Sequence, residues 1–220
     1  MKKHIVSFGC SFVDGSHEKE NLNRPNIGGT PTFPKQQLHE GIKPHVKKGW
    51  EACFTSELGE LVGTSTINQA LPGSGIRSAV YKALKYVEND KNALNSYIII
   101  GLSDLSRFDF IRPSIKDHWP KLPKTVYAEY YDKQDVIFEI QMLLKLTYGY
   151  FKEKNIPILF INTMNVDIST KDIVPTFIFP DGSEYWRSYL TSSDPTYKYE
   201  HPNIADHKHL AKLLADKLEL

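Results

Sequence analysis

The sequence has little cysteine, little net charge and no long apolar run, and each shortage excludes a class of protein. Its 220 residues include two cysteines, Cys10 and Cys53, which are too few for a disulfide framework. A formal net charge of +1 argues against a nucleic-acid-binding protein, because such proteins usually carry a basic excess. No stretch approaches the roughly 20 apolar residues that span a bilayer, so we expect no membrane partner.

The first residues resemble a secretory signal only superficially, because their apolar part is short and already contains His4 and Ser7. We interpret this stretch as the first strand of the fold and expect a cytoplasmic protein in a reducing compartment. Hydrophobic residues make up 40% of the chain, which is enough for a globular core. We see no internal repeat and no long linker, so residues 1–220 are expected to form one domain.

Short apolar runs alternate with helical stripes along the chain. The unbroken apolar run at 97–100 predicts a buried strand, and short apolar runs predict further strands at 5–8 and 158–163. The segment "STINQA" at 65–70 is interpreted as another short strand. Three- and four-residue spacings predict helices at 50–62, 76–90, 135–154 and 203–220. This alternation predicts a parallel sheet with helices on both faces. Three polar or irregular stretches, at 16–49, 111–133 and 166–200, are expected to be loop insertions.

One helical stripe, formed by Phe138, Met142 and Leu146, is interpreted as a core face and not as a binding surface.

His207 and His209 lie two residues apart in the last helix, so they point in different directions. Neither a paired carboxylate nor a cysteine stands at ligand spacing near them. We therefore predict no metal site and no cofactor.

Polar residues that suit catalysis follow the predicted strands. In a parallel sheet the chemistry lies outside the carboxyl ends of the strands. Ser11 follows the first strand, Asn68 and Gly73 follow the second, and Ser103 follows the third. A serine nucleophile needs a base, and His201, just before the last helix, is the candidate. Pro202 is expected at the start of that helix.

Each of these residues also has a purely structural interpretation. Ser11 is equally suited to capping a helix, Gly73 to a turn and Asn68 to hydrogen bonding at a strand end. Arg107 either pairs with Asp104 or faces the site and binds an anionic substrate group. Cys10 is interpreted as small packing and is left out of the site.

Four segments, "FGCSFVDG", "NQALPGSG", "IIGLSD" and "HPNIADH", resemble the motifs of the SGNH, or GDSL-like, hydrolases in order and approximate spacing. The chain looks most like small members with Gly-Cys-Ser in place of Gly-Asp-Ser, many of them encoded by bacteriophages. The resemblance implies a flavodoxin-like three-layer α/β/α sandwich and ester hydrolysis. It implies that Ser11 is the nucleophile, His201 the base and the Gly73 N–H an oxyanion donor, with Asn68 opening the second motif.

The sequence departs from the family pattern at two positions. Ser103 stands where the family has its oxyanion asparagine, and Lys198 stands where the family has an aspartate three residues before the histidine. The site would then use a Ser-His dyad, a carboxylate from elsewhere, or a backbone carbonyl that orients His201. The sequence also leaves open a site that is catalytically weak or inactive.

The leading hypothesis is a serine esterase, with a carbohydrate O-deacetylase as the specific guess. Small-molecule or glycan esters are the expected partners, and the sequence leaves the oligomeric state open. The alternatives are an inactive binding or assembly module and an acyltransferase. Aromatic loop residues are candidates either for stacking on sugar rings or for ordinary loop packing, and they are Trp119, Tyr127, Tyr130, Tyr131, Tyr185 and Trp186.

Overall fold

The computed structural model of the chain describes residues 4–10, 13, 53–70, 74–105, 132–164, 168–193 and 202–218. Four parallel strands form its sheet: β1 (His4–Phe8), β2 (Thr66–Asn68), β3 (Ser96–Leu102) and β4 (Ile158–Asn162). Their order is β2-β1-β3-β4. Strand β1 is central, with Ser7 opposite Asn68 of β2 and Ile99 of β3. This order is that of the first four strands of a flavodoxin-like sheet.

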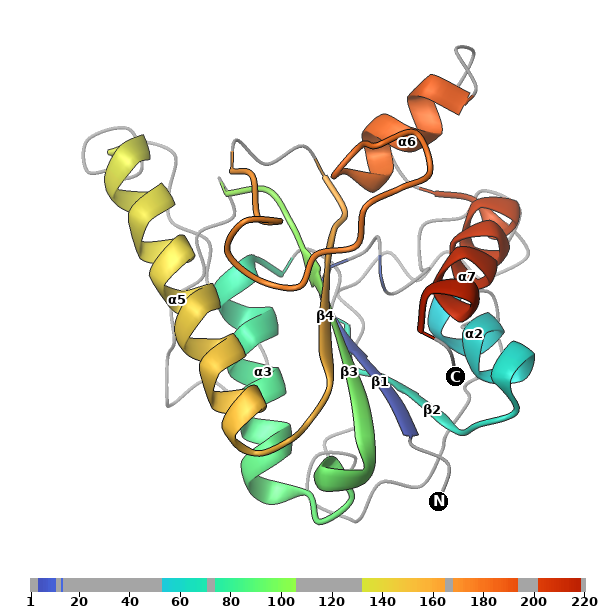
Figure 1. Cartoon of the computed structure of the whole chain (residues 1–220), viewed down its shortest axis with the longest axis horizontal. Helices are drawn as coiled ribbons and strands as arrows, with labels where there is room; N and C mark the ends of the chain where they lie inside the picture. Colours follow the sequence, from blue (N-terminus) through green and yellow to red (C-terminus); the bar gives the residue numbers. More distant parts are fainter. Residues whose placement is uncertain are drawn as a thin grey trace, which may run out of the picture.

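The helices of the described ranges cover both faces of the sheet. They are α2 (Phe54–Val62), α3 (Ile76–Asn89), the 3-10 turn η2 (Ala93–Asn95), α5 (Lys133–Glu153), α6 (Trp186–Ser193) and α7 (Ile204–Leu218). Helices α3 and α5 lie on one side of the sheet, and α2 and α7 lie together on the other (Figure 1). Right-handed crossovers explain this, because the chain steps from β1 to β2 in one direction and from β2 to β3 and β4 in the other. Within these ranges no helix combines the length and apolarity needed to cross a bilayer.

Alternate side chains of β1, β3 and β4 pack into two separate cores on the two faces of the sheet. Val6, Phe8, Ile98 and Ile100 pack with apolar residues of α3 and α5. Ile5, Ile99, Leu159 and Ile161 pack with residues of α2, α6 and α7. Because both faces are buried, β3 and β4 are nearly continuous apolar runs, as expected for parallel strands. The predicted three-layer α/β/α architecture is confirmed.

Three local expectations are wrong. The segment 166–200, expected to be a loop, contains the helix α6. It also forms two parallel bridges with β4, Phe160 with Thr176 and Asn162 with Tyr185.

Pro202 does not start the last helix. Helix α7 begins at Ile204, two residues after Pro202, because Asn203 and Asp206 cap it reciprocally. The Asn203 N–H donates to the Asp206 carboxylate at 2.7 Å, and the Asp206 N–H donates to Asn203 Oδ1 at 3.0 Å, as in a capping box.

The stripe Phe138, Met142 and Leu146 is also not a core face. These side chains are 66%, 39% and 67% exposed. Helix α5 carries a second apolar stripe, and that stripe faces the sheet. Its buried members are Val136, Ile140, Leu144, Thr147 and Phe151.

Two glycines allow the turn after β1 to sit directly on the sheet. A Cβ built on Gly9 would lie 2.5 Å from Val13 Cγ2, and one built on Gly101 of β3 would lie 2.2 Å from the same atom. Gly9 also has φ +156°, a conformation that side chains rarely adopt. The buried Val13 side chain therefore fills the space that side chains at Gly9 and Gly101 would occupy. This packing fixes the turn that follows the central strand.

We predict opposite effects on stability for alanine at Gly101 and at Gly149. Gly101→Ala should destabilise the fold by about 1–3 kcal/mol, because its methyl group overlaps Val13. Gly149 is a matched control in α5, where an added Cβ meets nothing within 4 Å. Gly149→Ala should stabilise the helix by about 0.5–1 kcal/mol. Urea unfolding of both variants measures this, and an unchanged midpoint for Gly101→Ala would contradict the close approach.

Candidate functional site

The predicted site residues divide into two groups. Ser11, Gly73, Arg107 and His201 lie outside the described residues, so their assignments stay predictions. Asn68 and Ser103 are described, at the carboxyl ends of β2 and β3. The described neighbours of the first group show which parts of the backbone the fold brings to this edge of the sheet.

Asn68 braces the turn after β1. Its amide Nδ2 donates to the Val13 carbonyl at 3.1 Å and to Cys53 Sγ at 3.3 Å. Its Oδ1 accepts from the Ala70 N–H at 3.0 Å and from the Ser7 hydroxyl at 3.2 Å. Both amide hydrogens are thus engaged within the protein. A role at the oxyanion would require Asn68 to release one of these bonds.

Cys10 packs into the core, in agreement with its exclusion from the predicted site. Its side chain is fully buried, and its Sγ lies 3.7 Å from Thr163 Oγ1. The Thr163 hydroxyl in turn donates to the Leu102 carbonyl of β3 at 2.8 Å. Cys10 and Cys53 are both free thiols. Because the Val13 N–H donates to the Cys10 carbonyl at 3.0 Å, residues 10 and 13 close a tight turn at the edge of the sheet.

Two serines connect the segments that follow β1, β2 and β3. The Ser74 hydroxyl donates to the Gly9 carbonyl at 2.7 Å. The Ser103 hydroxyl donates to the Ser74 carbonyl at 3.1 Å. Ser74 directly follows Gly73, and Gly9 lies two residues before Ser11. Ser103 therefore contacts backbone next to Gly73, and Ser74 contacts backbone two residues before Ser11, although the sequence predicts no role for Ser74.

The start of α7 is tied to the same edge through α2. The backbone N–H of Phe54, the first residue of α2, donates to His207 Nδ1 at 3.1 Å. The His207 ring stacks on Phe54 with centroids 6.2 Å apart and meets the Trp186 ring edge-on at 5.1 Å. Cys53, the residue before Phe54, accepts from Asn68. These contacts link the turn after β1 to the helix that His201 precedes by three residues.

Burial keeps His207 neutral. The side chain is 1% exposed, and burial lowers the pKa of His207 from 6.5 to about 3. Since Nδ1 accepts from the Phe54 N–H, the proton of the neutral ring resides on Nε2. Nε2 is buried and has no hydrogen-bond partner within the described part of the chain. From the sequence we consider His207 only as a metal ligand, although its helical spacing from Leu210, Ala211 and Leu214 places it on the buried face of α7.

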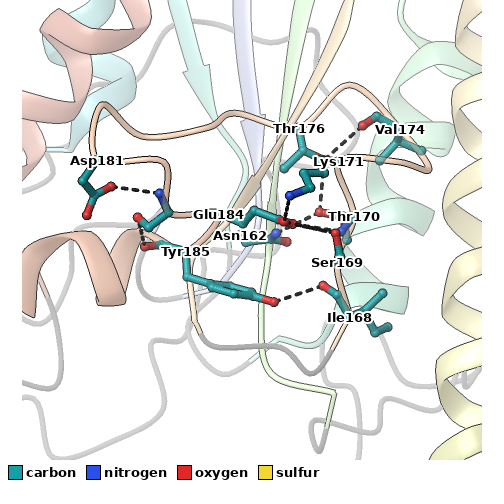
Figure 2. A network of polar contacts seen from close by, with 11 residues as sticks. Asn162, Ile168, Ser169, Thr170, Lys171, Val174, Thr176, Asp181, Glu184 and Tyr185 are labelled. Carbon is teal, nitrogen blue, oxygen red and sulfur yellow. Dashed lines mark hydrogen bonds and ion pairs between the residues drawn. The ribbon is translucent and has the colours of Figure 1, made fainter. Parts of the chain in front are cut away.

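The segment after β4 is held by a polar network (Figure 2). Glu184 accepts from the Ser169 hydroxyl at 3.1 Å, from the Thr170 N–H at 3.2 Å and from Lys171 at 3.1 Å. Burial raises the pKa of Glu184, but the bonds from Lys171, Ser169 and Thr170 outweigh it and hold the pKa below its ordinary value. Asn162, at the end of β4, donates to Thr170 Oγ1 at 2.8 Å. The network explains how 168–185 is fixed against the sheet.

This segment also decides between the two interpretations of Trp186. The Trp186 side chain is 1% exposed and packs edge-on against Phe54 at 6.0 Å, so it is a core residue and not a sugar-stacking surface. The Tyr185 hydroxyl donates to the Ile168 carbonyl at 3.3 Å. The other four aromatic candidates lie outside the described residues. Among the residues that the structure does describe, no three His, Cys, Asp or Glu side chains form a group that could hold a metal ion.

No protein-family model matches the chain, and no curated protein matches its sequence. Solved structures of similar fold include a member of the lipolytic G-D-S-L family from Veillonella parvula. It has 10% sequence identity and a TM-score of 0.49, and the alignment covers 97% of this chain and 96% of that one. A G-D-S-L lipolytic protein from Desulfitobacterium hafniense has 10% identity and a TM-score of 0.48, with coverage of 97% and 98%.

The psychrotrophic esterase EstA from Pseudoalteromonas sp. has 8% identity and a TM-score of 0.48, with coverage of 99% of this chain and 97% of that chain. The strand order and the two helical layers, and not these likenesses, establish the architecture of this chain.

We predict that His207 makes the fold sensitive to acid. Because the folded-state pKa of His207 is depressed to about 3, the unfolded chain binds the additional proton first as the pH falls below about 6.5. The contribution of His207 to the free energy of unfolding should therefore be fully present well above pH 6.5. It should fall as the pH is lowered, with a slope approaching about 1.4 kcal/mol per pH unit toward pH 5. Protonation also places a donor on Nδ1, where the Phe54 N–H bond needs an acceptor.

His207→Gln keeps a side-chain oxygen as acceptor but removes the titration. Its free energy of unfolding should be lower than that of the wild type at pH 7 and should change less between pH 7 and pH 5. Urea unfolding at half-unit steps of pH measures both. Equal slopes for the two proteins would show that His207 is not the source of the acid sensitivity.

Proposed function

We propose that the chain is a serine esterase of the SGNH type that hydrolyses a small acyl ester through an acyl-enzyme on Ser11. The proposal is supported by the order of the sequence motifs and by the parallel sheet with strand order β2-β1-β3-β4. In such sheets ligands bind outside the carboxyl ends of the strands, at the point where the strand order reverses. Here that point lies between β1 and β3.

The observation that carries the proposal is the contact between the segments after β1, β2 and β3. Through the hydroxyls of Ser74 and Ser103, the backbone next to Ser11 and Gly73 meets at one edge of the sheet. A nucleophile and an oxyanion donor need such a shared location. The link from Asn68 and Cys53 through Phe54 to His207 supports a position for His201 on the same edge.

In the proposed reaction, Ser11 Oγ attacks the acyl carbonyl carbon and its proton passes to the His201 imidazole. Backbone N–H groups, that of Gly73 among them, stabilise the oxyanion. Collapse of the tetrahedral intermediate breaks the bond to the alcohol, which leaves with the proton from His201. A water molecule, deprotonated by His201, then attacks the acyl-enzyme, and the carboxylic acid and free Ser11 are released.

The specific substrate class that we propose is an O-acetylated carbohydrate, as the family resemblance implies. With water replaced by an acceptor alcohol, the same residues would perform acyl transfer. Two features favour an inactive binding module as the second candidate. Lys198 occupies the family's aspartate position, and the Ser103 hydroxyl already donates its hydrogen bond to the Ser74 carbonyl.

Ser11→Ala tests the nucleophile. Hydrolysis of p-nitrophenyl acetate should fall by about a thousandfold or more, because the covalent step is lost. A fluorophosphonate probe should label the wild type at Ser11, as located by peptide mass spectrometry, and should not label the variant.

Ser192→Ala serves as the control. Its hydroxyl lies on α6 and donates to Asp181 at 2.8 Å, so its loss should leave hydrolysis unchanged. If Ser11→Ala hydrolyses the ester at the wild-type rate, Ser11 is not the nucleophile. If the wild type is neither labelled nor active but binds acetylated glycans, the protein is an inactive binding module and not an esterase.

A further inference from the structure

The Ser103 hydroxyl has a single hydrogen to donate, and the structure shows where it goes. It is donated to the Ser74 carbonyl at 3.1 Å, within a site where Ser103 is 1% exposed and Ser74 is 4% exposed. A serine that stabilised an oxyanion directly would have to direct the same hydrogen at the substrate. The Ser74 carbonyl would then lose its buried hydrogen bond, which is unfavourable in a dry environment.

The Ser74 hydroxyl continues the connection to the central strand. It donates to the Gly9 carbonyl at 2.7 Å, and that carbonyl belongs to the peptide unit just before Cys10. The two hydroxyls thus form a relay from the segment after β3, through the segment after β2, to the turn after β1. Each hydroxyl holds backbone within two residues of a proposed site residue, Ser11 or Gly73.

The packing around Gly9 shows that the relay acts on the same turn that Val13 and Asn68 hold against the sheet. Val13 lies against Gly9 on the same turn, and Asn68 holds the Val13 carbonyl. The Ser74 hydroxyl joins this turn to the backbone directly after Gly73. Asn68 holds the same turn from the end of β2, so the Ser74 bond is a second connection, on the other side of Gly73 in the sequence.

We propose that Ser74 and Ser103 are positioning residues, whose buried hydroxyl relay sets the location of the Ser11 turn relative to the Gly73 segment. Ser103 therefore does not replace the family's asparagine as an oxyanion donor; it acts on catalysis through Ser74. This inference rests on the proposed esterase function for its kinetic consequences. The relay itself also has a structural readout that needs no substrate.

The kinetic test compares Ser74→Ala and Ser103→Ala with Ser96→Ala. Ser96 is a matched control, since it is fully buried at the other end of β3 and its hydroxyl donates to the Asn92 carbonyl at 2.9 Å. Ser74→Ala and Ser103→Ala each lose one donated hydroxyl bond, and Ser96→Ala loses its bonds with the Asn92 carbonyl and the Tyr86 hydroxyl, so all three variants should lose thermal stability. Only Ser74→Ala and Ser103→Ala should also lower kcat for p-nitrophenyl acetate, by about tenfold to a hundredfold with KM little changed, because misplaced groups lose rate.

Ser103→Thr and Ser103→Asn distinguish positioning from direct donation. Threonine keeps the hydroxyl and should restore most of kcat. Asparagine supplies the longer amide donor of the family but cannot reproduce the bond to Ser74 in so buried a place, so it should lower kcat. An increase in kcat for Ser103→Asn, or an equal loss of kcat in Ser96→Ala, would overturn the positioning role.

Amide hydrogen exchange provides the second readout. The Val13 N–H, which is bonded to Cys10, should exchange faster in Ser74→Ala than in Ser96→Ala under native conditions. Equal exchange in the two variants would overturn the relay. If the wild type shows no Ser11-dependent activity but the exchange differs as expected, the proposed function fails while the relay stands.

Discussion

The close approach of Val13 to Gly9 and Gly101 is the constraint on which the rest of the carboxyl edge depends. Because neither glycine has a side chain, one valine methyl group can lie against the carboxyl ends of both β1 and β3. Val13, in the turn that follows β1, is therefore packed onto the sheet. Asn68 then fixes the Val13 carbonyl, and through Cys53 and Phe54 the same set of contacts reaches α7.

This arrangement gives a physical interpretation to one departure from the SGNH pattern, the serine at position 103. A serine at position 103 suits a crowded, buried edge where the available partner is a backbone carbonyl. An amide there would be longer and would need a second acceptor. The chain thus orders its loops by hydroxyl-to-carbonyl bonds, and in the proposed mechanism oxyanion stabilisation falls to backbone N–H groups.

The three-layer architecture could be predicted from the sequence because β3 and β4 are nearly continuous apolar runs that alternate with helical stripes. Helix α6 could not, since only Trp186 and Leu190 of its eight residues are buried and so short a pattern is weak. Helix α5 has two apolar stripes, and periodicity alone does not show which one the sheet covers. Asn68 and Ser103 were found as strand-end residues, but Ser74 and His207 act through contacts with distant segments, which spacing does not encode.

The proposed reaction requires the turn after β1 and the residues before α7 to meet at one edge of the sheet, with the Ser11 hydroxyl beside the His201 imidazole. The most direct test is a crystal structure of the protein after reaction with a fluorophosphonate. We expect phosphorus bonded to Ser11 Oγ, the His201 imidazole within hydrogen-bond distance of the adduct, and an adduct oxygen facing the Gly73 N–H. An adduct on another residue, or an imidazole separated from Ser11 by packed core, would contradict the account.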